Sequence, residues 1–139
     1  GLPAARAEEH RLAAAAREQI DFTGLTGSAA RIASELPLGQ QRYVEIARAL
    51  ATGATLLLLD EPAAGLDDTE TGQLSELVLR IRARGVTVLL IEHDMDLVFA
   101  FADRLSVMVN GPMLVEGPPN EVARDPRVKT VYLGEAADA

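Results

Sequence analysis

Two adjacent carboxylates, Asp60 and Glu61, come directly after four consecutive leucines at residues 56–59 and directly before Pro62. Carboxylates at the end of a buried strand are costly to leave unpaired, and a bound cation is the usual compensation. Asp60 is therefore a candidate ligand for Mg²⁺, directly or through water, and Glu61 could orient an attacking water. A helix cap or an ion pair is the alternative for any single pair of carboxylates. The leucines before the pair and the proline after it favour the functional interpretation.

A histidine occupies the equivalent place after the next apolar run. His93 lies 32 residues after Glu61 and follows the run at residues 86–91. An imidazole can donate a hydrogen bond to a phosphate or a water. A lone histidine is more often structural, as we expect for His10 within an Ala/Glu/Arg helix, but the position of His93 beside the carboxylates reverses that expectation. In parallel sheets the chemistry lies beyond the carboxyl ends of the strands, so the sequence predicts a site between residues 60 and 94.

Two further segments are weak signals when each is taken alone. Gly39 and Gln40 lie at the start of a predicted helix, where free N–H groups can face an anion. Residues 63–67 connect the carboxylate pair to the following helix, and this segment is equally well a plain loop with Asp67 as the helix cap.

The elements that must position these residues alternate between strand and helix. The helix after Asp67 has an apolar face at i, i+3, i+4 and i+7, and it separates two continuous apolar strands. This βαβ pattern predicts a parallel sheet, with strands buried on both faces, in an α/β chain. The predicted helices cover residues 5–20, 28–35, 40–51, 68–84, a segment containing 97–101, and 126–134, and the predicted strands cover residues 55–59, 86–91, 105–109 and 113–116.

The composition excludes several classes of function. The chain has 139 residues, enough for one ordinary domain, and is 48% hydrophobic and 24% charged, which describes a globular chain rather than a disordered one. Its net charge of −8 disfavours binding to nucleic acid or to an anionic membrane surface. It has no cysteine and no apolar run long enough to span a bilayer, and its first residues do not have the pattern of a signal peptide.

In combination, these segments resemble the ATPase subunits of ABC transporters. Residues 36–40 are similar to the signature motif, residues 56–60 to the Walker B strand, and residues 64–67 to the D-loop. Glu61 matches the catalytic glutamate of the family, and His93 matches the H-loop histidine. The resemblance extends over residues 8–134, and residues 39–50, 91–95 and 125–134 are most similar to the ATPases of branched-chain amino-acid importers.

Two departures from the family pattern bear on what the chain can do. Pro37 stands where the signature normally has serine, although Gly39 and the helix N-terminus could still bind phosphate. No Walker A loop is present, because that loop needs a Gly-Lys pair and the only lysine, Lys129, follows Val128. The resemblance therefore implies an incomplete P-loop NTPase fold that lacks the Walker A strand, as in the C-terminal half of a subunit. Its parts would be a portion of the helical subdomain at residues 1–52, the ATPase core at 53–117, and C-terminal helices at 118–139.

The resemblance also implies a mechanism and partners. Two complete subunits would pair head to tail around two ATP molecules with Mg²⁺ and drive transmembrane permease subunits from the cytoplasmic face of the membrane. Glu61 would polarise water, His93 would contact the γ-phosphate, Asp60 would hold Mg²⁺ through water, and Asp67 would communicate across the dimer. The signature residues acting on the partner's nucleotide would be Pro37, Leu38, Gly39 and Gln40.

Other functions remain open at this point. The same subunit could serve urea or amide import or lipid export, because no residue here touches the solute. The chain could instead be a non-catalytic interaction piece. By itself the 139-residue chain is expected neither to hydrolyse ATP nor to bind it tightly, because the Walker A loop is absent. It is also expected to self-associate through an unpaired strand edge.

Overall fold

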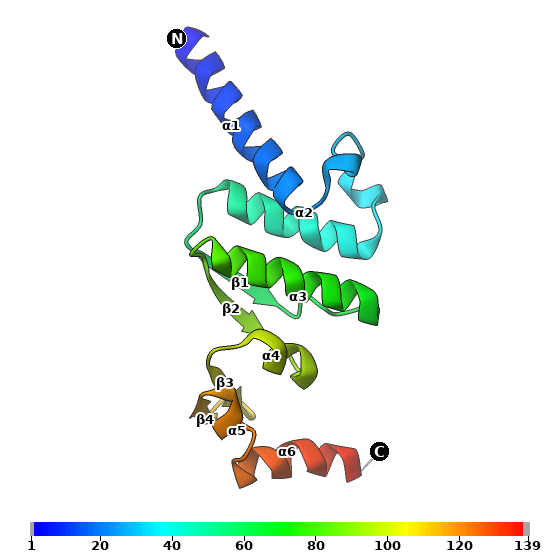
Figure 1. Cartoon of the computed structure of the whole chain (residues 1–139), viewed down its shortest axis with the longest axis vertical. Helices are drawn as coiled ribbons and strands as arrows, with labels where there is room; N and C mark the ends of the chain where they lie inside the picture. The colour runs from blue at the N-terminus through cyan, green and yellow to red at the C-terminus, as the bar shows by residue number, and fades with distance from the viewer. Residues whose placement is uncertain (1, 138–139) are drawn as a thin grey trace. The chain divides into compact units, whose positions relative to one another are not determined.

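The computed structural model describes residues 2–137, and the side chains within residues 3–131. The chain divides into two compact units, residues 1–93 and 94–139. The first unit contains helices α1 to α3 and strands β1 and β2, and the second contains all later elements (Figure 1). No helix in the described residues is long and apolar enough to cross a membrane.

The first unit begins with helices. Helix α1 spans Leu2–Phe22 and α2 spans Leu38–Ala51, both close to the predicted ranges. The predicted helix over residues 28–35 is wrong, since two short 3₁₀ turns, η1 at Thr26–Ser28 and η2 at Ala33–Glu35, occupy this region. Ile32 between them is extended, with φ −71° and ψ 126°, and it interrupts the helical path. So short a segment is also marginal as an independent helix.

The predicted βαβ unit is present in the first unit. Strands β1, Leu56–Asp60, and β2, Thr87–Ile91, pair in parallel from Leu56 opposite Thr87 to Asp60 opposite Ile91. Helix α3, Asp68–Ala83, connects them. All four residues of its predicted apolar face are at most 1% exposed: Leu74, Leu77, Val78 and Ile81.

The prediction that these strands are buried on both faces is wrong for the described residues. Leu57 on β1 is 4% exposed, whereas its neighbours Leu56 and Leu58 are 52% and 65% exposed. Leu89 and Ile91, which share the exposed face because they pair with Leu58 and Asp60, are 58% and 59% exposed. The sequence has the apolar pattern of a sheet that is covered on both faces, but the described residues cover only the face that carries Leu57.

The second unit contains a hairpin and three helices: α4 at Met95–Phe101, β3 at Leu105–Met108, β4 at Met113–Gly117, α5 at Pro119–Val122 and α6 at Pro126–Ala137. Strands β3 and β4 pair antiparallel through the predicted turn, where Asn110 and Gly111 both have positive φ. Val107, Val122 and Val128 form its buried core. Helix α6 does not end at Gly134 as predicted but continues to Ala137, through alanines that favour helix.

Candidate functional site

The carboxyl ends of β1 and β2 bring Glu61 and His93 together. Asp60 pairs with Ile91 in the sheet, and the N–H of Glu61 then donates to the Ile91 carbonyl at 2.8 Å. His93 Nδ1 lies 3.6 Å from Glu61 Oε1. This separation suits an ion pair with a protonated imidazole but is longer than a hydrogen bond. Two side chains that are 32 residues apart in the sequence therefore share one edge of the sheet.

Both side chains are open to an incoming ligand. The Glu61 side chain is 53% exposed and that of His93 is 77% exposed. Glu61 also has a φ of +44°, a sparsely populated conformation for a residue with a side chain. Such backbone strain is common at functional sites, because it aims a side chain where an unstrained turn would not. A carboxylate and an imidazole in this arrangement could contact a water and a phosphate side by side.

Glu92 is a contact residue that sequence reasoning missed. Its Oε1 accepts a hydrogen bond from the Ala63 N–H at 3.0 Å, and the Ala64 N–H donates to the Glu61 carbonyl at 3.1 Å. The loop after β1 is thus bonded to itself and to the end of β2. No local pattern in the sequence indicates this contact, because the partners are 29 residues apart and meet only through strand pairing.

Asp60 is an exposed carboxylate beside a small cavity of about 150 Å³. Arg42 and Glu45 of α2 also line this cavity. No group of three or more His, Cys, Asp or Glu that could hold a metal occurs among the described residues. Asp60 by itself cannot supply all the ligands of a metal ion. A single carboxylate does fit Mg²⁺, which is commonly held by one or two carboxylates, with water and substrate phosphate supplying the other ligands.

The predicted signature segment forms the start of α2. Pro37 is the N-cap residue and provides no side-chain hydrogen bond to the first turn. Leu38 is 44% exposed, whereas Gly39 is buried. The side chain of Gln40 is engaged within the chain, since its Oε1 accepts from Ser28 Oγ at 2.9 Å. The backbone N–H groups of the first turn are consequently the part of this segment best able to face an anion.

The start of α2 lies against the loop that follows the carboxylate pair. A Cβ at Gly39 would lie 2.8 Å from Glu70 Oε1, and one at Gly65 would lie 3.0 Å from the Leu38 side chain. Asp67 is the N-cap of α3, where its Oδ1 accepts from the Glu70 N–H at 2.8 Å and Glu70 Oε2 accepts from the Asp67 N–H at 3.2 Å. Glu70 was not singled out from the sequence, although Asp67 followed three residues later by Glu70 is a capping-box signal.

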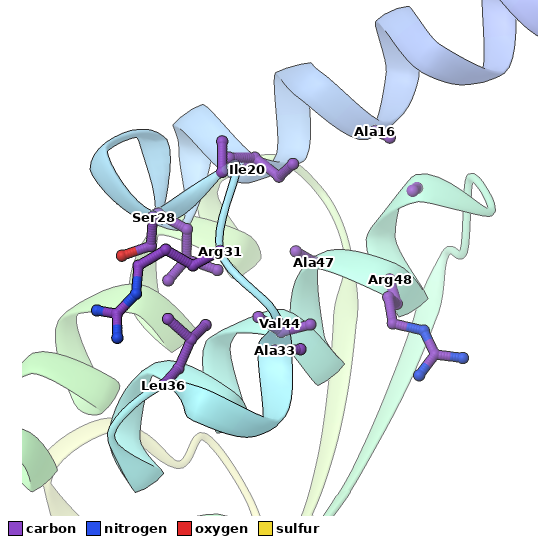
Figure 2. A pocket seen from close by; sticks show the side chains of 12 residues that line it. Ala16, Ile20, Ser28, Arg31, Ala33, Leu36, Val44, Ala47 and Arg48 are labelled. Atoms are coloured by element: carbon purple, nitrogen blue, oxygen red, sulfur yellow. The ribbon is translucent and has the colours of Figure 1, made fainter.

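A larger pocket of about 210 Å³ lies beside the signature segment, because Leu36 and Ser28, the hydrogen-bond partner of Gln40, line it. It is lined by α1, the η1–η2 segment and α2 (Figure 2). The labelled apolar side chains Ile20, Leu36 and Val44 surround it, while the guanidinium groups of Arg31 and Arg48 extend outward. Asp60, Glu61 and His93 do not contribute to its lining.

Two family models match the chain. The ABC transporter model matches residues 2–64, and the model for the branched-chain amino acid ATP-binding cassette transporter matches residues 113–138. The chain is 44% identical over 135 residues to the high-affinity branched-chain amino acid transport ATP-binding protein BraF of Pseudomonas aeruginosa, and 46% identical over 118 residues to LivG of Escherichia coli K12. These alignments cover 96% and 84% of the chain, but only 53% and 46% of the relatives.

Similarity to solved structures supports the same conclusion. The ADP conformation of an ATP-binding cassette of an ABC transporter matches with a TM-score of 0.81 and 36% identity over 88% of this chain, and a nucleotide-free ATP-binding cassette matches with 0.81 and 35%. This chain covers 50% and 49% of those structures, so it spans about half the length of the relatives that it matches. Sequence and fold together show that the chain is similar, over about half of their length, to ATP-binding subunits of the ABC transporter family, and among them to those of branched-chain amino-acid transport.

Proposed function

We propose that the chain supplies the water-activating carboxylate and the signature segment of an ATPase subunit that energises an ABC importer for branched-chain amino acids. The observation that carries this proposal is the placement of Glu61 and His93, 3.6 Å apart and exposed, at the paired ends of β1 and β2. The proposal concerns the complete subunit, because the chain covers about half of its relatives.

In the complete subunit, ATP with Mg²⁺ supplies the phosphoryl group and the charge neutralisation that its transfer needs. The carboxylate of Glu61 orients a water and accepts a hydrogen bond from it. His93 donates to the γ-phosphate from the neighbouring strand end. Asp60 would hold Mg²⁺, through water, in the complete subunit. These roles are positioning and electrostatics, so few side chains suffice for them.

The signature segment is proposed to act on the nucleotide of a second ATPase subunit in a head-to-tail dimer. Pro37 has no hydroxyl to offer, so the contact is made by the first-turn N–H groups at Leu38, Gly39 and Gln40. Asp67 has a second role in this proposal, communication across the dimer, in addition to capping α3. Asp67 is exposed in this chain, as a residue that faces a second subunit must be before the dimer forms.

The proposed solute and partners rest on the relatives. A match to the branched-chain family model at residues 113–138 and 44% identity to BraF favour amino-acid import over lipid export. The lipopolysaccharide export protein LptB of Acidithiobacillus ferridurans is 40% identical over only 70% of the chain. We accordingly propose permease subunits as partners and a peripheral position on the inner face of the cell membrane.

The isolated 139-residue chain is proposed to be inactive and to self-associate. It has a single lysine, Lys129, and no Gly-Lys pair that could cradle phosphates. Within the described residues β2 pairs with β1 alone, and β3 pairs with β4, so the outer edge of β2 is unpaired. Light scattering with an ATP titration tests both statements, and a stable monomer with micromolar affinity for ATP would contradict them.

The catalytic assignment is tested in a chimera that joins this chain to the remaining half of BraF. Glu61→Gln should lower ATP hydrolysis by about 10²–10⁴-fold while ATP binding survives, because the amide cannot act as a base. Glu76→Gln, at an exposed position on α3, is the matched control and should retain activity. Hydrolysis near the wild-type rate in Glu61→Gln would overturn the assignment.

The signature assignment is tested with a pair of substitutions in the same chimera. Pro37→Ser should change hydrolysis modestly, since the proposed contact uses backbone N–H groups. Gly39→Asp should reduce it severely, because it places a carboxylate against phosphate and a side chain against Glu70. Equal and mild effects of the two changes would mean that the segment is only the lead-in to a helix.

A further inference from the structure

The loop after β1 is held at two points by consecutive residues of the second strand end. The Ile91 carbonyl accepts from the Glu61 N–H at 2.8 Å, and Glu92 Oε1 accepts from the Ala63 N–H at 3.0 Å. The first contact continues the sheet ladder by one residue. The second contact is made by the half-buried side chain of Glu92, which reaches from the segment after β2 to the loop after β1.

These two contacts enclose the strained residue. Glu61 has a φ of +44°, and it lies between the ladder bond at its own N–H and the Glu92 bond two residues later. A non-glycine residue keeps such a conformation only when its surroundings determine it. The direction in which the Glu61 carboxylate leaves the sheet therefore depends on what fixes the loop at Ala63.

We infer that Glu92 is a positioning residue for Glu61: by accepting the Ala63 N–H, its carboxylate holds the strained turn that aims Glu61 toward His93. This inference rests on the proposed function of Glu61. A bond from an ionised acceptor to a backbone N–H is stronger than a neutral one, and the bond is shielded because Glu92 is half-buried. Glutamine retains a carbonyl oxygen at the same reach, whereas alanine has no acceptor.

The contact is tested first in the 139-residue chain, by amide hydrogen exchange read residue by residue. Glu92→Ala should raise the exchange rate of the Ala63 N–H by about tenfold or more, because its acceptor is lost. If Glu92 positions the turn, the Glu61 and Ala64 amides should also exchange faster. Glu92→Gln should restore most of the protection at all three amides, and Glu76→Ala should leave them unchanged. Unchanged exchange at Ala63, or faster exchange confined to Ala63, would overturn the inference.

The consequence for catalysis is tested in the BraF chimera. Glu92→Ala should lower kcat by about 10–100-fold with little change in KM for ATP, because a misplaced base loses rate and not nucleotide contacts. Glu92→Gln should recover most of kcat. An unchanged kcat would overturn a positioning role. So would a lower kcat that is accompanied by a changed KM and a lower thermal stability in both variants. A wild-type chimera without ATPase activity would count against the proposed function, and the exchange measurements would then decide the role of Glu92 by themselves.

Discussion

Replacing Gly39 by alanine tests how the start of α2 is coupled to the cap of α3. The new Cβ would lie 2.8 Å from Glu70 Oε1, closer than such atoms approach, and 3.3 Å from its Cδ, which is a tight contact. Glu70 is a flexible side chain, so its carboxylate should swing away. That movement breaks the 3.2 Å bond that Glu70 Oε2 accepts from the Asp67 N–H. The other half of the capping box, from the Glu70 N–H to Asp67 Oδ1, uses no atom of the Glu70 side chain and should survive.

Two opposing contributions set the magnitude. Removing glycine from a helix stabilises it by about 0.5–1 kcal/mol, with the smaller figure expected in the first turn. Losing one exposed hydrogen bond costs about 0.5–1 kcal/mol. Gly39→Ala alone should therefore leave the local stability within about 0.5 kcal/mol of wild type. In a Glu70→Ala background nothing obstructs the Cβ, and the same substitution should stabilise by about 0.5–1 kcal/mol.

Native-state hydrogen exchange of the α2 and α3 amides measures these opening free energies without assuming that the whole chain unfolds in one step. The double-mutant cycle of Gly39 and Glu70 should give a coupling of about 0.5–1 kcal/mol. Gly72→Ala is the matched control, because a Cβ at Gly72 meets nothing within 4 Å and its effect should not depend on Glu70. Equal effects of Gly39→Ala in the two backgrounds would refute the proposed coupling.

Three other predictions concern stability and pH. Leu77 is 1% exposed, and Leu77→Ala should lower the free energy of unfolding of the first unit by about 2–5 kcal/mol in urea unfolding. Leu79 on the same helix is 45% exposed, and a loss of stability in Leu79→Ala as large as that in Leu77→Ala would contradict this packing. Burial, aided by nearby carboxylates, raises the pKa of the Tyr43 phenol above 10.0, so its contribution to stability should be complete below about pH 10 and lost as the pH rises through the folded value. Subtracting the tyrosinate absorbance of Tyr43→Phe isolates this titration, and an ordinary value would contradict the packing of α2. The side chain and backbone N–H of Arg127 lower the pKa of Asp125 from 3.8 to about 2, so its contribution should be complete above about pH 4 and lost as the pH falls through about 2. Carboxyl NMR should show the pKa of Asp125 rising in Arg127→Ala, and no change there would refute the pairing.

The sequence alone determined the features that arise from local periodicity and short motifs. The four buried residues of α3, the parallel pair of strands and the Asn110–Gly111 turn were all predicted, because each depends on spacing within one element or between neighbours. The nearness of Glu61 and His93 was also predictable, since parallel strands end at one edge of a sheet. The resemblance to ABC transporter ATPases assigned these residues to motifs of that family, and the similarity to curated relatives supports the resemblance.

Only the tertiary structure decided which surfaces are covered and which long-range contacts form. An apolar run indicates that a strand can be buried on two faces. Whether both faces are covered depends on which other elements pack against the sheet, and Leu58 and Leu89 remain exposed here. The bond from Ala63 to Glu92 and the contact of Gly39 with Glu70 join residues about thirty positions apart. Such contacts depend on strand pairing and on how helices meet, which are set by the packing of the whole unit and leave no local pattern in the sequence.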